Sequence, residues 1–135
     1  MSTATAGHGQ TLRWAAIAGA VLIGLVGLIH AYDAPDSFAE VFYKGALFAA
    51  NGLAAAVAAF GILRGSRWGW HLGALVAAGS IVGYVISRTT GLPPLPPDEW
   101  LEPLGVASLV IEAAFLAVYV RAISGASAPK SRPGA

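Results

Sequence analysis

The stretch Gly105-Val-Ala-Ser-Leu-Val-Ile-Glu-Ala-Ala-Phe-Leu-Ala-Val-Tyr119 is apolar except for Ser108 and one carboxylate, Glu112. It belongs to an apolar run from Leu104 to Val120, which with its flanks is long enough for a transmembrane helix of about 20 residues. An ionisable side chain inside such a helix is costly. Glu112 therefore requires a physical reason, which is either functional or structural.

Three further apolar runs precede this one, and the composition agrees with a membrane protein. The chain has 135 residues, of which 56% are hydrophobic and 11% charged, whereas a soluble domain carries about 25% charged residues. These features predict a single all-α domain, a four-helix transmembrane bundle. The predicted spans are residues 13–32, 41–63, 68–88 and 103–121, and disordered tails are expected at 1–12 and 122–135. An acidic turn broken by Pro35 is expected after the first span.

A secretory signal peptide is the alternative interpretation of the first run. A signal peptide usually begins with several basic residues and ends at a cleavage site of small residues. Only Arg13 precedes this run, and the residues that follow it, His30-Ala-Tyr-Asp-Ala34, make a poor cleavage site. A retained helix is therefore expected.

The charged residues divide between the two ends of the predicted bundle. Because the side that is rich in Lys and Arg faces the cytoplasm, both termini are expected inside, in a bacterial plasma membrane. The predicted inner side carries Arg13, Arg64, Arg67, Arg121, Lys130 and Arg132. The predicted outer side carries Asp33, Asp36, Glu40, Lys44, Arg88, Asp98, Glu99 and Glu102.

The residue types also limit the partners and the chemistry. With a net charge of +1 and basic residues only near helix ends, nucleic acid is not indicated as a partner. No Cys is present, which excludes disulfides and thiolate metal sites. Small residues at four-residue spacing, such as Gly79 and Gly83, favour close helix contacts in lipid. Beyond the lipid bilayer, the expected partner is a second copy of the chain or another membrane protein.

Counting inward from the predicted outer ends places several polar residues at one depth. Glu112 and Asn51 lie about nine or ten residues into their spans, or roughly 14–15 Å, and Ser80 lies roughly 12 Å from Arg88. Ser108 is one turn from Glu112 on the same helix face. The functional interpretation is a midplane polar site or proton relay around Glu112. The structural alternative is a neutral Glu that is hydrogen-bonded to Asn51 and Ser108 and fixes the helix register.

A second group of candidates lies at the predicted outer rim. It comprises His30, Glu40, Arg88 and Glu102, with Asp33, Asp36 and Lys44 nearby. In the simpler interpretation, Arg88 pairs with Glu102 or Glu40 and holds helix ends together. The alternative is a cation site in which His30 and two carboxylates are the ligands. No spacing here matches a known metal motif, so no metal is predicted.

Enzyme motifs are missing from the chain. It has no G-x-S-x-G, no phosphate-binding glycine loop and no H-E-x-x-H. His30 and His71 are predicted at opposite ends of the bundle, which argues against a bis-His haem. We therefore predict no catalytic residue and no cofactor, and favour a protein that is not an enzyme.

Two strings, Ser87-Arg-Thr-Thr-Gly-Leu-Pro93 and Glu102-Pro103 followed by Glu112, carry a resemblance to known sequences. Together with the run from Gly65 to Ser87, they make the chain similar to small four-span membrane proteins of actinomycete-type bacteria. This resemblance covers most of the chain except the tails. It implies architecture and location, and it implies no activity or catalytic residues.

Three functions are compatible with these observations. The first is an accessory or scaffolding role through helix contacts, indicated by the small-residue faces. The second is a small transporter or proton-linked protein with a site around Glu112, Asn51, Ser80 and Ser108. The third is an outer-surface metal site at His30.

Overall fold

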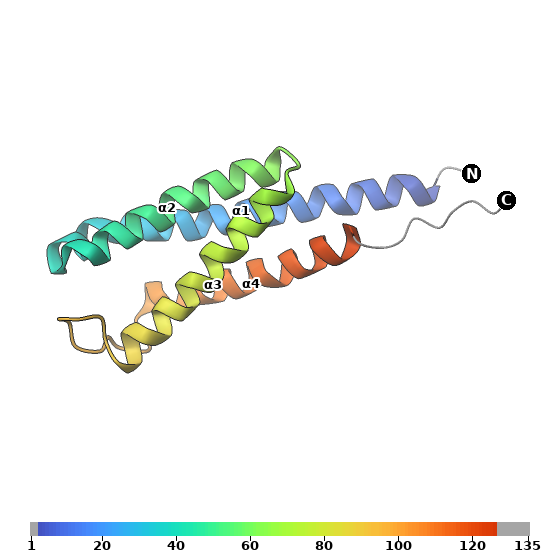
Figure 1. Cartoon of the computed structure of the whole chain (residues 1–135). Helices are drawn as coiled ribbons and strands as arrows, with labels where there is room; N and C mark the ends of the chain where they lie inside the picture. Colours follow the sequence, from blue (N-terminus) through green and yellow to red (C-terminus); the bar gives the residue numbers. More distant parts are fainter. Residues whose placement is uncertain (1–2, 127–135) are drawn as a thin grey trace.

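The protein is a bundle of four antiparallel helices that follow one another up and down (Figure 1). The computed structural model describes residues 3–126. Within that part of the chain, the helices are α1 (Thr3–Glu40), α2 (Phe42–Leu63), α3 (Arg67–Thr89) and α4 (Pro103–Ala126). Each helix is long and apolar enough to cross a membrane. The fold is therefore all-α, as predicted, and is that of a small multi-pass membrane protein.

The two ends of the bundle differ in charge, and we name them accordingly. The acidic end contains the α1–α2 junction and the α3–α4 loop, while the basic end contains the start of α1, the α2–α3 turn and the end of α4 (Figure 1). Around this bundle α1 contacts α2 and α4, and α3 contacts α2 and α4. The four helices thus form a closed ring of neighbours.

The first helix is much longer than the predicted span of residues 13–32. It begins at Thr3, where a disordered tail was expected, and continues through Pro35 to Glu40, where an acidic turn was expected. Pro35 removes one helical hydrogen bond, but the flanking residues Ala34 and Ser37 are 8% and 5% exposed. Packing against neighbouring helices lets such a proline remain inside a membrane helix.

The last helix also extends beyond its prediction. It continues from the expected end at Arg121 to Ala126, so the predicted tail of 122–135 is helical in its first residues. The remainder of that tail, with Lys130 and Arg132, lies outside the described residues, as do residues 1 and 2 of the N-terminal tail.

The α1–α2 junction consists of the single residue Val41. Its backbone is extended, with φ −158° and ψ 134°, and the next helix starts at once. The two helices therefore run back along each other in close contact. A Cβ atom added to Gly27 would lie 3.0 Å from the Ala55 Cβ atom, and one on Gly52 would lie 3.2 Å from the Gly27 carbonyl oxygen. Glycine at both positions permits this separation of the helices.

The α2–α3 turn brings the next two helices together in the same way. Gly65 adopts a φ of 75°, which favours glycine, and reverses the chain. A Cβ atom on Gly69 would lie 2.6 Å from the Ile62 nitrogen and 2.7 Å from the Gly61 carbonyl carbon. The start of α3 therefore lies directly against the end of the α2 backbone.

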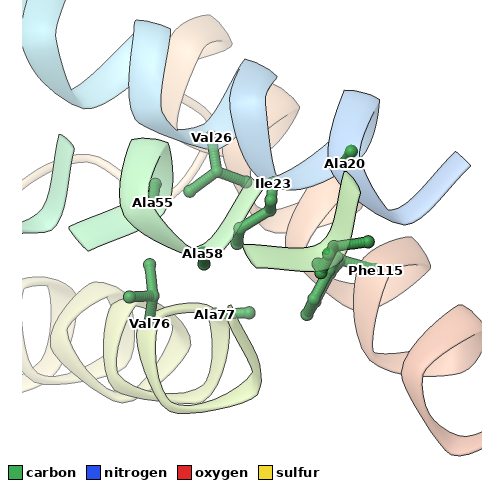
Figure 2. Packing of buried hydrophobic residues seen from close by; sticks show 9 residues of the cluster. Ala20, Ile23, Val26, Ala55, Ala58, Val76, Ala77 and Phe115 are labelled. Carbon is green, nitrogen blue, oxygen red and sulfur yellow. The ribbon is translucent and has the colours of Figure 1, made fainter. Parts of the chain in front are cut away.

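An apolar core lies where the four helices meet (Figure 2). Phe115 of α4 is fully buried, packs over Gly73 and stacks on Trp70 with 5.9 Å between ring centroids. Most large apolar side chains instead face outward, as expected in lipid, where no hydrophobic effect draws them inside. The buried core residues are Ala20, Ile23, Val26, Ala55, Ala58, Ile62, Val76, Ala77 and Phe115.

Candidate functional site

The structure brings the four predicted midplane residues together as two neighbouring hydrogen-bonded pairs, which we call the buried polar network (Asn51, Ser80, Ser108 and Glu112). The Ser108 hydroxyl donates to Glu112 Oε1 at 2.8 Å, and Asn51 Nδ2 donates to Ser80 Oγ at 2.6 Å. The Ser80 hydroxyl group also lies close to the Glu112 carboxyl group. The network therefore connects α2, α3 and α4.

Glu112 is the most enclosed member of the buried polar network. It is 2% exposed and Ser108 is 7% exposed, whereas Asn51 and Ser80 are half-buried. None of the ion pairs formed within residues 3–126 includes Glu112. The carboxyl group is thus held by hydroxyl groups and not by a cation.

Asn51 sits at the far end of the network and uses only part of its side-chain amide. Its Oδ1 atom is buried and makes no hydrogen bond within the described part of the chain. The amide nitrogen donates to Ser80, so the amide oxygen is an unused acceptor on the α2 side of the network. Its neighbour Gly52 lies at the close α1–α2 contact.

A second polar group lies at the acidic end, and we call it the charged clasp (Glu40, Lys44, Arg88, Asp98 and Glu102). Lys44 forms an ion pair with Glu40, and its Nζ atom lies 4.0 Å from Asp98 Oδ2. Arg88 lies 3.9 Å from Asp98 and 3.8 Å from Glu102. The signs of charge alternate along this series, which links the α1–α2 hairpin to α3, the α3–α4 loop and the start of α4.

Arg88 is the central residue of the charged clasp. Its side chain is 10% exposed, and its guanidinium group lies 3.7 Å from the centre of the Tyr84 ring. Nε donates to the Glu99 carbonyl oxygen at 3.1 Å, and Nη1 donates to Ser87 Oγ at 2.7 Å. These contacts fix the α3–α4 loop to the end of α3.

Glu102 joins the charged clasp to the first turn of α4. Its carboxylate accepts hydrogen bonds from the backbone nitrogens of Leu104 at 2.9 Å and Gly105 at 2.6 Å. Such a carboxylate satisfies free N–H groups and complements the positive end of the helix. The predicted pairing of Arg88 with Glu102 is present, whereas Glu40 pairs with Lys44.

His30 does not belong to the charged clasp, although the sequence placed it at the rim with Glu40, Arg88 and Glu102. Because α1 continues to Glu40, His30 lies about ten residues, or roughly 15 Å, from the end of its helix. It is 9% exposed, its Nδ1 atom donates to the Val26 carbonyl oxygen at 2.9 Å, and its ring lies 5.1 Å from that of Phe48. The rim position predicted for His30 is corrected accordingly.

The same region bears on the alternative hypothesis of a metal site at His30. Within the described residues, no group of three His, Asp or Glu side chains could hold a metal ion. His30 instead has a backbone and an aromatic neighbour, so the geometry gives the metal hypothesis no support.

Two polar contacts were not anticipated from the sequence. Asp98 reaches Lys44 and Arg88 because the proline-rich loop folds back, and its backbone nitrogen donates to the Ser87 carbonyl oxygen at 2.9 Å. His71 of α3 and Tyr119 of α4 are hydrogen-bonded at 2.9 Å. Charge is the sequence signal that could have indicated the first of these contacts, because Asp98 is an acidic residue at an end of the bundle that carries two basic residues.

No family model, curated protein sequence or solved structure matches this chain. The fold and the site define its class: a small multi-pass helical membrane protein with a carboxyl group buried among hydroxyl and amide groups.

Proposed function

We propose that this chain is a small proton-linked protein of the bacterial plasma membrane, in which Glu112 is the group that gains and loses the proton. The observation that supports this proposal most directly is the burial of Glu112 within a network that spans three helices. Ionisable residues inside membrane spans are functional candidates by default because retaining them is costly.

The chemistry of the network supports a change of protonation. A charged carboxylate in a low-dielectric interior is stable only with a compensating partner, and Glu112 has hydroxyl neighbours in place of a cation. The proposed resting form is therefore the neutral acid. Loss of its proton would place a charge beside Ser80 and Ser108, which belong to two different helices. Rearrangement of α3 against α4 is the proposed consequence.

A second candidate function is an accessory or scaffolding role. The observation that favours it is the face of α3 that carries Gly79 and Gly83, since a Cβ atom at either position would meet nothing within 4 Å. Small residues on a membrane helix let another helix approach closely. The proposed partner is a second copy of the chain or another membrane protein.

Substitutions of Glu112 distinguish these two functions. Glu112→Gln keeps the size and hydrogen bonding of the side chain but cannot release a proton, so we expect normal folding and loss of pH-dependent activity. Glu112→Ala also leaves the Ser108 and Ser80 hydroxyl groups without their partner, which costs about 1–3 kcal/mol. The measurements are proton flux into liposomes containing the purified protein, and its thermal unfolding in detergent.

The infrared spectrum supplies a control that does not depend on activity. Wild-type protein should show the carbonyl band of a protonated carboxylic acid at neutral pH, and Glu112→Gln should lack it. Wild-type proton flux in Glu112→Gln would overturn the proton-linked role and leave the accessory role as the better explanation.

The proposed orientation places the basic end, with both termini, in the cytoplasm. Its support is the distribution of charge: Arg13, Arg64, Arg67 and Arg121 all belong to the basic end, and the side of a membrane protein rich in Arg and Lys is cytoplasmic. The resemblance to membrane proteins of actinomycete-type bacteria favours the plasma membrane as the location.

Single introduced cysteines test this orientation, because the chain contains no Cys of its own. We expect a membrane-impermeant maleimide to label Pro96→Cys, in the α3–α4 loop, when it is added to intact spheroplasts. Ser66→Cys, in the α2–α3 turn, should be labelled only after lysis. The reverse pattern would contradict the orientation, and labelling of both variants after lysis is the control for reactivity.

A further inference from the structure

The basic end carries arginines that have no acidic partner in the described part of the chain. Every Asp and Glu of the sequence lies at the acidic end or, for Glu112, in the buried polar network. Accordingly, Arg13, Arg64, Arg67 and Arg121 appear in none of the ion pairs found between residues 3 and 126. Arg64 lies over the Phe60 ring at 5.7 Å. Within residues 3–126, no carboxylate therefore compensates the positive charge of this end.

A crevice opens beside one of these arginines. It has a volume of about 300 Å³, and all four helices contribute to its walls. The walls are mainly apolar, and Arg67, in the first turn of α3, is the charged residue among them. Other lining residues are Leu12, Ala16, Ile62, Gly65 and Trp70.

We propose that this crevice binds an anionic phospholipid, with the lipid phosphate at Arg67 and an acyl chain along Leu12, Ala16 and Ile62. The charge and the shape of the site agree with this occupant. An apolar crevice suits an acyl chain, and an arginine binds phosphate through planar paired donors. Basic pockets between membrane helices bind acidic lipid headgroups in this way.

The position of Arg67 strengthens the preference for an anion. α3 begins at Arg67, and the preceding residue Ser66 makes no side-chain capping bond. The start of a helix is positive and offers free N–H groups. Arg67 and the helix end thus add their positive charge at the same edge of the crevice.

A second crevice provides an internal comparison. It has a volume of about 360 Å³ and lies between the start of α1 and the end of α4, with Trp14, Val118 and Arg121 among its lining residues. It also combines apolar walls with an arginine, and the last turns of α4 line both crevices, but only the first crevice adjoins the positive start of α3. An anion should therefore prefer the first crevice.

Lipid binding to the purified full-length protein tests the proposal. We expect native mass spectrometry from detergent to show retained phosphatidylglycerol in preference to phosphatidylcholine. Arg67→Gln should weaken phosphatidylglycerol binding about fivefold, the effect of one basic residue at a membrane surface. Arg64→Gln and Arg121→Gln remove the same charge from the same end, and we expect each to weaken binding clearly less than Arg67→Gln does, because neither arginine lines this crevice.

Each remaining outcome decides against the proposal. Equal losses in Arg67→Gln, Arg64→Gln and Arg121→Gln would show diffuse attraction and no site at Arg67. Equal retention of phosphatidylcholine and phosphatidylglycerol by the wild-type protein would show a crevice that accepts any acyl chain. If Arg67→Gln does not fold, Arg67→Lys serves in its place, and the salt dependence of wild-type binding is measured as well. We expect added salt to release phosphatidylglycerol from the wild-type protein. Binding that does not change with salt would overturn the proposal.

Discussion

Gly69→Ala is expected to destabilise the protein by about 3 kcal/mol, because one added methyl group overpacks a contact between two backbones. The new Cβ atom would lie 2.6 Å from the Ile62 nitrogen and 2.7 Å from the Gly61 carbonyl carbon. Backbone atoms cannot turn aside as a side chain does, so α3 must move away from α2. Thermal unfolding of the purified protein in detergent measures the loss.

Gly79→Ala is the matched control, since it adds the same methyl group to the same helix. A Cβ atom at Gly79 would meet nothing within 4 Å. Replacing glycine by alanine inside a helix is intrinsically favourable by about 1 kcal/mol, so this variant should be as stable as the wild type or slightly more stable. A similar loss in both variants would contradict the close contact between α2 and α3 at Gly69.

The second large effect is expected for Arg88→Ala, which should lower the free energy of unfolding by about 2 kcal/mol, because the enclosed guanidinium group donates two hydrogen bonds while its carboxylate partners are partly exposed. The substitution removes the contacts of the guanidinium group with Asp98, Glu102 and the Tyr84 ring. Asp98 and Glu102 would then remain near each other without this cation between them. The readout is again unfolding in detergent, combined with the rate of protease cleavage in the α3–α4 loop.

Arg64→Ala is the control for the loss of an arginine as such. Arg64 is exposed and contacts the Phe60 ring, so its removal should cost less than about 1 kcal/mol. If Arg64→Ala lowered the free energy of unfolding as much as Arg88→Ala does, the contacts of Arg88 in the charged clasp would add no more stability than those of an exposed arginine.

Hydropathy and depth were enough to predict the four helices and the common level of the four polar residues, although Asn51 bonds to Ser80 and not to Glu112 as expected. In an up-and-down bundle, the distance from a common end follows directly from the number of residues, because each residue adds about 1.5 Å. Glu112, Asn51 and Ser80 could therefore be placed at one level without knowledge of the packing. Ser108 followed from helical periodicity alone, since it lies one turn from Glu112.

The errors of the sequence analysis arise where packing overrules local signals. Pro35 is a strong local signal for a break, yet α1 continues through it beside the buried residues Ala34 and Ser37. That extension moved His30 from the expected rim to the interior. The contact of Asp98 with Arg88 depends on how an irregular loop folds back, and an irregular loop has no periodicity from which to predict it.

The junction at Val41 limits which insertions and deletions this protein can tolerate. Because α1 and α2 are joined by one residue, an inserted or deleted codon there would rotate α2 by about 100° relative to α1 if both helices persist. Gly52 would leave the face of Gly27, and Lys44 would leave the charged clasp. Insertions, including an epitope tag, should be tolerated far better between Leu92 and Pro97 of the α3–α4 loop, where no helix register depends on the number of residues.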